Sequence, residues 1–144
     1  MVNTISPTQV YEVFELFSQQ KNKKGRLKVL QENNIPALKD ILRGMFDNTI
    51  VFLLPEGKPP YTPNKPESAP STLLRKHREF GYFVKGGPGN QLPAFKREQM
   101  FIEMLEAVHP DDALLILAMV AKKSPVKGLT KTLVKEAYPN LIQE

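Results

Sequence analysis

Apolar residues recur every three or four positions along much of the chain, which is the spacing of one face of an α-helix. In the first third this pattern predicts three helices, from Pro7 to about Gln20, within 21–34, and from Pro36 to Phe46. Ser6 can cap the first of them, with Gln9 closing a capping box, and a proline suits the first helical position of the first and third. The chain therefore opens with three short amphipathic helices.

The same spacing predicts four more helices in the second half. We expect them from a Ser71 cap through about Phe80, from Pro93 to about Val108, from Pro110 to about Lys122, and from a Thr130 cap to a stop at Pro139. The third of these, "DDALLILAMVAKK", is apolar almost all round, which favours a central position in the core. The prediction is a single mainly α domain over residues 1–144, either a small helical bundle or a short stacked array of helix hairpins.

Long loops rich in proline and glycine separate these helices. The segment 49–54, "TIVFLL", is expected to be buried, but its composition suits a strand and a helical turn equally well. Residues 55–70 hold six of the thirteen prolines, which excludes regular helix or a central strand. A disordered linker and an ordered extended loop both fit this composition, and Tyr61 favours the ordered loop because burial of its ring would hold the loop to the body.

A glycine-rich stretch at 84–93, "VKGGPGNQLP", raises the possibility of a phosphate cradle. It matches neither phosphate-binding glycine pattern, since Lys85 precedes the glycines and no serine or threonine follows them. We therefore expect a flexible connector in which Gly86, Gly87 and Gly89 adopt positive φ angles.

Composition narrows the chemistry further. The chain has 144 residues and no cysteine, so disulfides, thiolate nucleophiles and cysteine-ligated metals are excluded. Its amino terminus lacks the basic start and unbroken apolar run of a secretory signal, and its longest apolar run, at 113–121, is shorter than a membrane span. These features predict a soluble intracellular protein without a membrane partner.

Catalytic groups are sparse. His77 is expected on a solvated basic face and His109 at a helix start, rather than as metal ligands. Asp111 and Asp112 suit the positive end of a helix, and no nucleophile turn is present. We therefore predict no enzyme activity, no cofactor and no metal site.

Basic residues are the most informative feature of a chain whose net charge is +5. They form three clusters: Lys21, Lys23, Lys24, Arg26 and Lys28; Arg75, Lys76 and Arg78; and Lys122, Lys123, Lys127, Lys131 and Lys135. On one shared face these clusters would contact several phosphates, whereas pointing apart they would be ordinary solvated surface. Few aromatic residues remain for base stacking, so any nucleic-acid binding should have little sequence specificity.

Three pieces, "LLPEGKPPYTPNKPESAPSTLLRKH", "LPAFKREQMFIEMLEAVHPDDA" and "KGLTKTLVKEAYPNLI", resemble a family of short, uncharacterised proteins of T-even-like contractile-tailed phages, particularly those that infect marine cyanobacteria. The resemblance covers nearly the whole chain. It implies a phage origin and synthesis in the host cytoplasm, and it supplies no catalytic residues.

The combined expectation is a non-catalytic phage accessory protein that binds nucleic acid or an acidic phage or host protein surface through its basic clusters. Two alternatives stay open: a structural or assembly protein of the virion, with the loop around Tyr61 and the last helix as contact arms, and a small modulator of a host protein.

Overall fold

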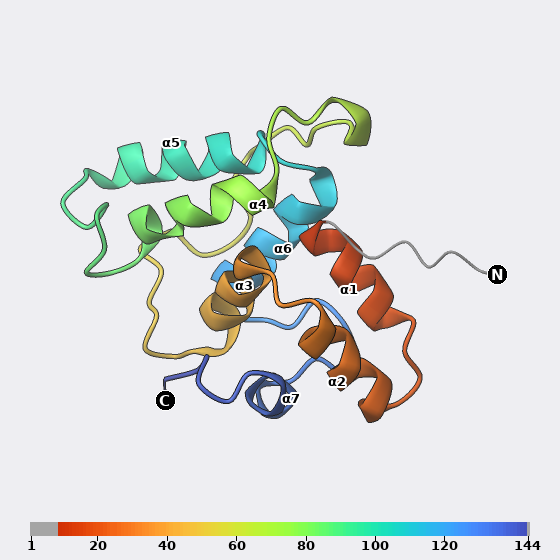
Figure 1. Cartoon of the computed structure of the whole chain (residues 1–144). Helices are drawn as coiled ribbons and strands as arrows, with labels where there is room; N and C mark the ends of the chain where they lie inside the picture. The colour runs from red at the N-terminus through yellow and green to blue at the C-terminus, as the bar shows by residue number, and fades with distance from the viewer. Residues whose placement is uncertain (1–8, 144) are drawn as a thin grey trace.

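The structure is a computed structural model that describes residues 9–143 (Figure 1). Helices account for most of the regular structure in this range, which confirms the predicted mainly α fold. The seven α-helices are α1 (Val10–Ser18), α2 (Lys23–Glu32), α3 (Pro36–Phe46), α4 (Leu73–Lys76), α5 (Ala94–Leu105), α6 (Pro110–Val120) and α7 (Lys131–Ala137), and two 3₁₀ turns are η1 (Pro66–Ser68) and η2 (His77–Phe83).

Helix α6 is the centre of the core, as its composition predicts. It packs most extensively against α3 and also contacts α5 and α1. A glycine permits the close approach to α3, because a Cβ atom at Gly44 would lie 2.6 Å from the Met119 sulfur. Large apolar side chains of both helices are fully buried, each contributing about 1.5–3 kcal/mol to folding; they include Leu38, Ile41, Leu42, Ile116 and Met119. One position departs from the prediction, since Leu114 is 55% exposed.

The remaining helices form two ends around this centre. At one end α2 packs against α1 and α7, and at the other α4 and η2 pack against α3, while α5 lies against η2 and α6. Figure 1 shows α2 and α7 at the bottom of the view, with α4 and α5 at the top. Basic clusters on α2 and on α4 therefore lie at opposite ends of the molecule.

The segment at 49–54 pairs as an extended chain at Phe52, which resolves the ambiguity in its sequence. The predicted burial is wrong, however, because none of its residues is buried and Val51 is 47% exposed. Phe52 and Val84 form an isolated antiparallel bridge. Around it the Leu53 N–H donates to the Phe83 carbonyl at 2.7 Å, and the Lys85 N–H donates to the Val51 carbonyl at 2.8 Å. The strand preference of the segment therefore leads to one bridged residue pair and not to a sheet.

The loop at 55–70 is ordered, in agreement with the expectation based on Tyr61. The Tyr61 ring packs against the hydrophobic core, and burial raises the pKa of the Tyr61 hydroxyl. The Thr62 N–H donates to Glu106 Oε2 at 2.8 Å, and the Asn64 side-chain amide donates to the carbonyls of Glu106 and Val108. The proline-rich segment is thus held against the carboxyl end of α5.

The glycine-rich stretch at 84–93 is a connector, as predicted. It is held by hydrogen bonds rather than flexible, and its three glycines do not all have a positive φ. Only Gly86 has a positive φ, of 84°. The other two glycines are needed for close packing, because a Cβ atom at Gly89 would lie 1.9 Å from the Tyr82 carbonyl oxygen and one at Gly87 would lie 2.2 Å from that of Gly81. Two carbonyls of the loop, from Gly89 and Leu92, accept hydrogen bonds from Arg97.

Three further local predictions are wrong. Helix α1 begins at Val10 after an extended Gln9, which forms the capping box with Glu12; Ser6 and Pro7 lie outside the described residues. The helix expected through Phe80 ends at Lys76 and continues as the 3₁₀ turn η2, and its N-cap is Thr72 rather than Ser71.

Phe95 is the third of these errors. Helical spacing predicts one apolar face made of Phe95, Phe101, Ile102, Leu105 and Val108. Phe95 instead lies in the first turn of α5 and is 72% exposed.

Candidate nucleic-acid interface

Helices α2 and α7 lie side by side, which brings together two basic clusters that are about a hundred residues apart in the sequence. Each helix begins at a side-chain cap: Asn22 accepts from the Gly25 N–H at 2.9 Å, and Thr130 Oγ1 accepts from the Leu133 N–H at 3.2 Å. Their apolar residues are buried in the core, at Val29, Leu30, Leu133 and Val134. Most lysines of the two helices lie on the outside of the pair, since four of them are exposed: Lys23, Lys24, Lys28 and Lys135.

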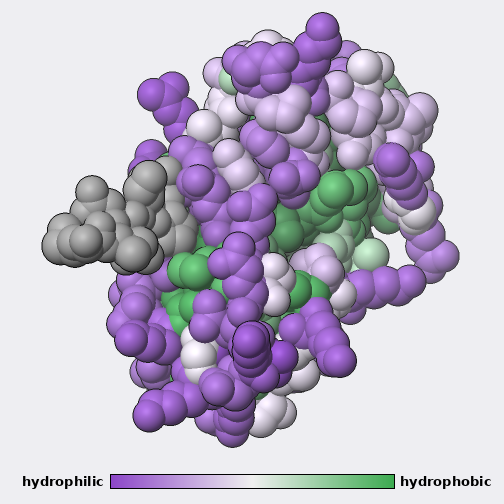
Figure 2. All heavy atoms as spheres, turned by 90° about the vertical axis from the view of Figure 1, so that its right-hand side faces the viewer, coloured by the Kyte–Doolittle hydropathy of each residue, from purple (hydrophilic) through white to green (hydrophobic). Residues whose placement is uncertain are grey.

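We define the α2–α7 face as residues 21–32 together with 127–137. It contains eight basic residues and two acidic ones. Lys23 Nζ joins the two helices through an ion pair with Glu136 Oε1 at 2.8 Å, and Lys28 pairs with Glu32 at 3.9 Å on α2 itself. The lower part of Figure 2, the end of the molecule where Figure 1 shows α2, is covered mostly by hydrophilic residues.

A hollow of about 300 Å³ lies between the two helices, lined by Lys23, Arg26, Gly128, Thr130, Thr132, Leu133 and Glu136. The guanidinium of Arg26 makes no hydrogen bond or ion pair with any residue that the structure describes, and its Nε atom is shielded from solvent. This position is unfavourable for the Nε–H group, because it loses water without gaining an acceptor.

The other predicted residues of this face are mostly exposed. Lys21, Lys24 and Lys127 lie on its surface, as does Lys135 on α7, whereas Lys131 is half-buried. The structure thus brings together eight of the thirteen predicted basic residues.

Lys122 does not belong to this face, which corrects the prediction. Its ammonium donates to the carbonyls of Gly44 at 2.6 Å and Asp47 at 2.8 Å, and it lies 5.2 Å from the centre of the Phe52 ring. Burial lowers the pKa of Lys122, and the nearby Asp47 carboxylate opposes that shift. The residue holds the carboxyl end of α3 in place and is not available to a ligand.

Lys123, next to Lys122, is exposed. It lines a larger hollow of about 970 Å³ between the segment 48–58 and the end of α6, whose other lining residues are mainly apolar.

The cluster Arg75, Lys76 and Arg78 also lies apart, on α4 and η2 at the opposite end of the molecule (Figure 1). Arg75 and Arg78 are exposed, and Lys76 pairs with Glu79 at 3.1 Å. The three clusters therefore do not form one face, although two of them largely do.

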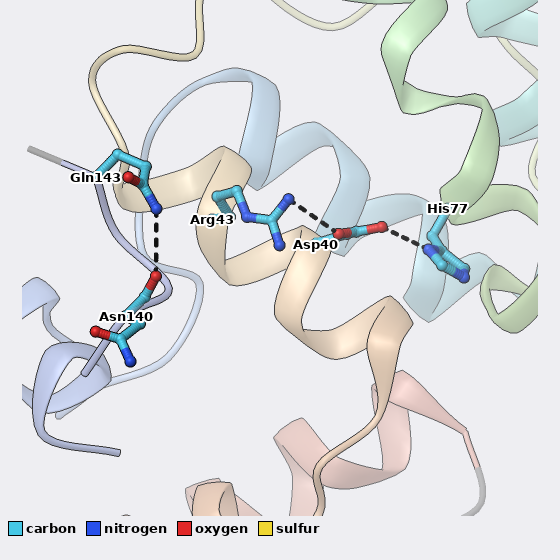
Figure 3. Close-up of polar contacts among 5 residues, drawn as sticks. All are labelled: Asp40, Arg43, His77, Asn140 and Gln143. Atoms are coloured by element: carbon cyan, nitrogen blue, oxygen red, sulfur yellow. Dashed lines mark hydrogen bonds and ion pairs between the residues drawn. The ribbon is translucent and has the colours of Figure 1, made fainter. Parts of the chain in front are cut away.

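His77 is buried, which corrects the expectation that it lies on a solvated basic face. It is 9% exposed, and its Nδ1 lies 2.6 Å from Asp40 Oδ2, while Asp40 Oδ1 lies 3.6 Å from an Arg43 nitrogen (Figure 3). These contacts connect α3 to η2. A signal was present in the sequence, because Leu73, His77 and Phe80 share helical spacing and are all buried.

Asp112 is a second buried polar residue that the sequence did not reveal. It is 1% exposed, and its Oδ1 accepts from the Tyr11 N–H at 3.2 Å. Burial raises the pKa of Asp112 to about 6, although hydrogen bonds from the Leu73 and Tyr11 amides act in the opposite direction. The carboxyl group ties α6 to α1 through Oδ1, while Oδ2 is buried without a hydrogen-bond partner among the described residues.

His109 has the helix-start role that its position predicts. Its Nδ1 accepts from the Asp111 N–H at 3.0 Å, and its ring stacks on that of Tyr11 at 3.9 Å between centroids.

Within residues 9–143, no three histidine, aspartate or glutamate side chains are grouped closely enough to hold a metal ion. None of the helices described in that range has the length and apolar character needed to cross a membrane.

Comparison with known proteins gives one result. The model of a protein family, described as a family of unknown function (DUF6433), matches residues 13–125. The chain belongs to this family. The matched region of the DUF6433 family includes all of α2 and α6 but ends before α7, so only one half of the α2–α7 face lies within it. No curated protein and no solved structure matches the chain.

Proposed function

We propose that the chain binds the phosphate backbone of nucleic acid, without sequence preference, through the α2–α7 face. The observation that carries this proposal is the juxtaposition of two distant basic clusters around a guanidinium that has no partner among the described residues. We assign the binding to the host cytoplasm during phage infection, in keeping with the resemblance to phage proteins.

The charge arrangement favours a polyanion as the partner. Only two acidic residues, Glu32 and Glu136, interrupt the basic residues of the face, and each lies within 4 Å of one lysine. If about four phosphates are neutralised, the logarithm of the binding constant should fall with the logarithm of salt concentration at a slope of about −4.

The available contacts favour a duplex backbone over single-stranded bases. Single strands are commonly held by stacking on exposed aromatic rings. Tyr138, which follows α7 at the edge of the face, instead donates its hydroxyl to the Leu30 carbonyl, and burial raises the pKa of that hydroxyl to about 12. Its ring is thus occupied in joining α7 to α2.

The proposal is tested by gel shift of a random-sequence DNA duplex at about 50 mM and about 200 mM salt. The triple substitution Lys21→Ala, Lys24→Ala and Lys127→Ala should weaken binding at low salt by about 10- to 100-fold. The reason is that binding releases fewer counterions from the DNA when fewer phosphates are contacted. The matched control removes three exposed charges elsewhere, by Arg75→Ala, Arg78→Ala and Lys85→Ala.

The control variant should bind within about threefold of the unmodified chain, since its charges lie off the face. Absence of duplex binding at low salt would exclude the proposal. Equal weakening by the two triple variants would show that net charge, and not this face, carries the attraction.

A further inference from the structure

The guanidinium of Arg26 lies face-on to Gly128. A Cβ atom at position 128 would be 2.7 Å from Arg26 Cζ, 2.7 Å from its Nε and 2.9 Å from its Nη1. Three atoms of one planar group at nearly equal distances mean that its flat side covers the glycine. The N–H groups lie in that plane and so point sideways, away from Gly128.

The turn at Gly128 is built in a way that only glycine permits easily. Its φ is 88°, in the left-handed region, and a side chain there would occupy the space of the guanidinium. The turn thus positions Arg26 at the hollow between α2 and α7 without supplying an acceptor to it.

The other side chains that line the hollow include hydrogen-bond donors for an anion and one carboxylate that competes with the anion for them. The Lys23 ammonium and the Thr132 hydroxyl can donate to an anion, while the Glu136 carboxylate holds Lys23 at 2.8 Å. Lys23 and Glu136 are both well exposed, so an entering anion can displace the carboxylate at little cost.

From this geometry we propose that the hollow is a phosphate subsite in which Arg26 holds one phosphodiester group of the bound nucleic acid. The inference rests on the proposed function and adds the residue that fixes the register of the backbone on the face. A guanidinium presents paired N–H groups that match two phosphate oxygens, which a lysine ammonium does not.

Two substitutions test the subsite without changing the net charge. Arg26→Lys keeps the charge and removes the paired donors, and Gly128→Ala forces the guanidinium out of position. Each should weaken duplex affinity about fivefold while leaving the salt slope unchanged, because the number of cations at the face is the same.

Gly57→Ala is the matched control for Gly128→Ala. Gly57 has a φ of 89°, nearly the same as Gly128, but a Cβ atom there meets nothing within 4 Å. Both alanine variants therefore carry the same backbone strain, measured as a loss of thermal stability, and only Gly128→Ala disturbs Arg26. A third variant, Glu136→Gln, should tighten binding about two- to threefold by releasing Lys23.

If the unmodified chain binds the duplex and both Arg26→Lys and Gly128→Ala bind equally well, the subsite is wrong and the proposed function stands. If the unmodified chain does not bind the duplex, the proposed function fails, and the subsite is tested with inorganic phosphate. A saturable shift of the Arg26 Nε–H resonance in ¹⁵N NMR, absent in Gly128→Ala, would support the subsite; no shift would overturn it.

Discussion

Two arginines, each close to a glycine turn, mark the difference between the two ends of the molecule. Arg97, in α5, donates to the carbonyls of Leu53 at 3.1 Å, Gly89 at 3.2 Å and Leu92 at 2.7 Å. The guanidinium of Arg26, in α2, lies against Gly128 and donates to none of the described residues. The same side chain is thus part of the fold at one end and available for an external acceptor at the other.

This contrast shows why charge clusters in a sequence are poor guides to function when taken alone. Lys122 resembles Arg97 in its role, because its ammonium donates hydrogen bonds to two backbone carbonyls of the fold. The basic side chains that remain for a partner are those without a hydrogen-bond acceptor in the fold. Tertiary packing determines which basic side chains have such an acceptor.

The largest expected effect concerns Arg97. Arg97→Ala should lower the free energy of unfolding by about 3–4 kcal/mol, because three carbonyl acceptors lose a charged donor. Arg26→Ala should cost less than about 1 kcal/mol, since it breaks no hydrogen bond within the fold. Urea unfolding of both variants gives the comparison, and similar losses for the two would contradict the assignment of different roles.

A somewhat smaller effect concerns Asp112, which joins α6 to α1. The pKa of Asp112 is raised from 3.8 to about 6, so the folded state binds a proton more tightly than the unfolded state. Its contribution to stability is therefore present below about pH 4 and is lost as pH rises through 6, by about 2–3 kcal/mol.

Asp112→Asn removes this titration. The difference in unfolding free energy between the unmodified chain and Asp112→Asn should therefore change between about pH 4 and about pH 7. The unmodified chain should become less stable relative to the variant as pH rises. A difference that is constant over this range would show that the carboxyl group is not held in its protonated form by burial.

The smallest of the three effects concerns Lys122. Lys122→Met keeps most of the side-chain volume and removes the donor to Gly44 and Asp47, which should cost about 2 kcal/mol. Lys123→Met, at the neighbouring exposed position, should change stability by less than about 0.5 kcal/mol. Thermal or urea unfolding of the pair distinguishes a lysine used by the fold from one on the surface.

Local signals predicted most of the helices but few of the contacts between them. Pro36 and Thr130 mark helix starts through short-range geometry, and α6 is central because its composition leaves few polar positions. The end of the helix after Thr72 was missed, because the turn η2 is stabilised by burial of Phe80 and Phe83 rather than by helix propensity.

The candidate site was predicted only in part, for a related reason. Its basic residues are visible in the sequence, but the pairing of α2 with α7 depends on burial of apolar side chains on both helices. The same holds for the contact between His77 and Asp40, which are 37 positions apart. Neither pairing leaves a local pattern that a single sequence could reveal.

The hydrogen bonds from Asn64 to the end of α5 determine how this part of the fold opens. The carbonyls of Glu106 and Val108 are satisfied by a side chain more than forty residues earlier, so this helix end is completed by a long-range contact. Its last turn and the proline-rich loop should open and close as one cooperative unit. Amide hydrogen exchange at Thr62 and at Ala107 should accordingly proceed at a common rate, set by release of the loop and not by fraying of the helix.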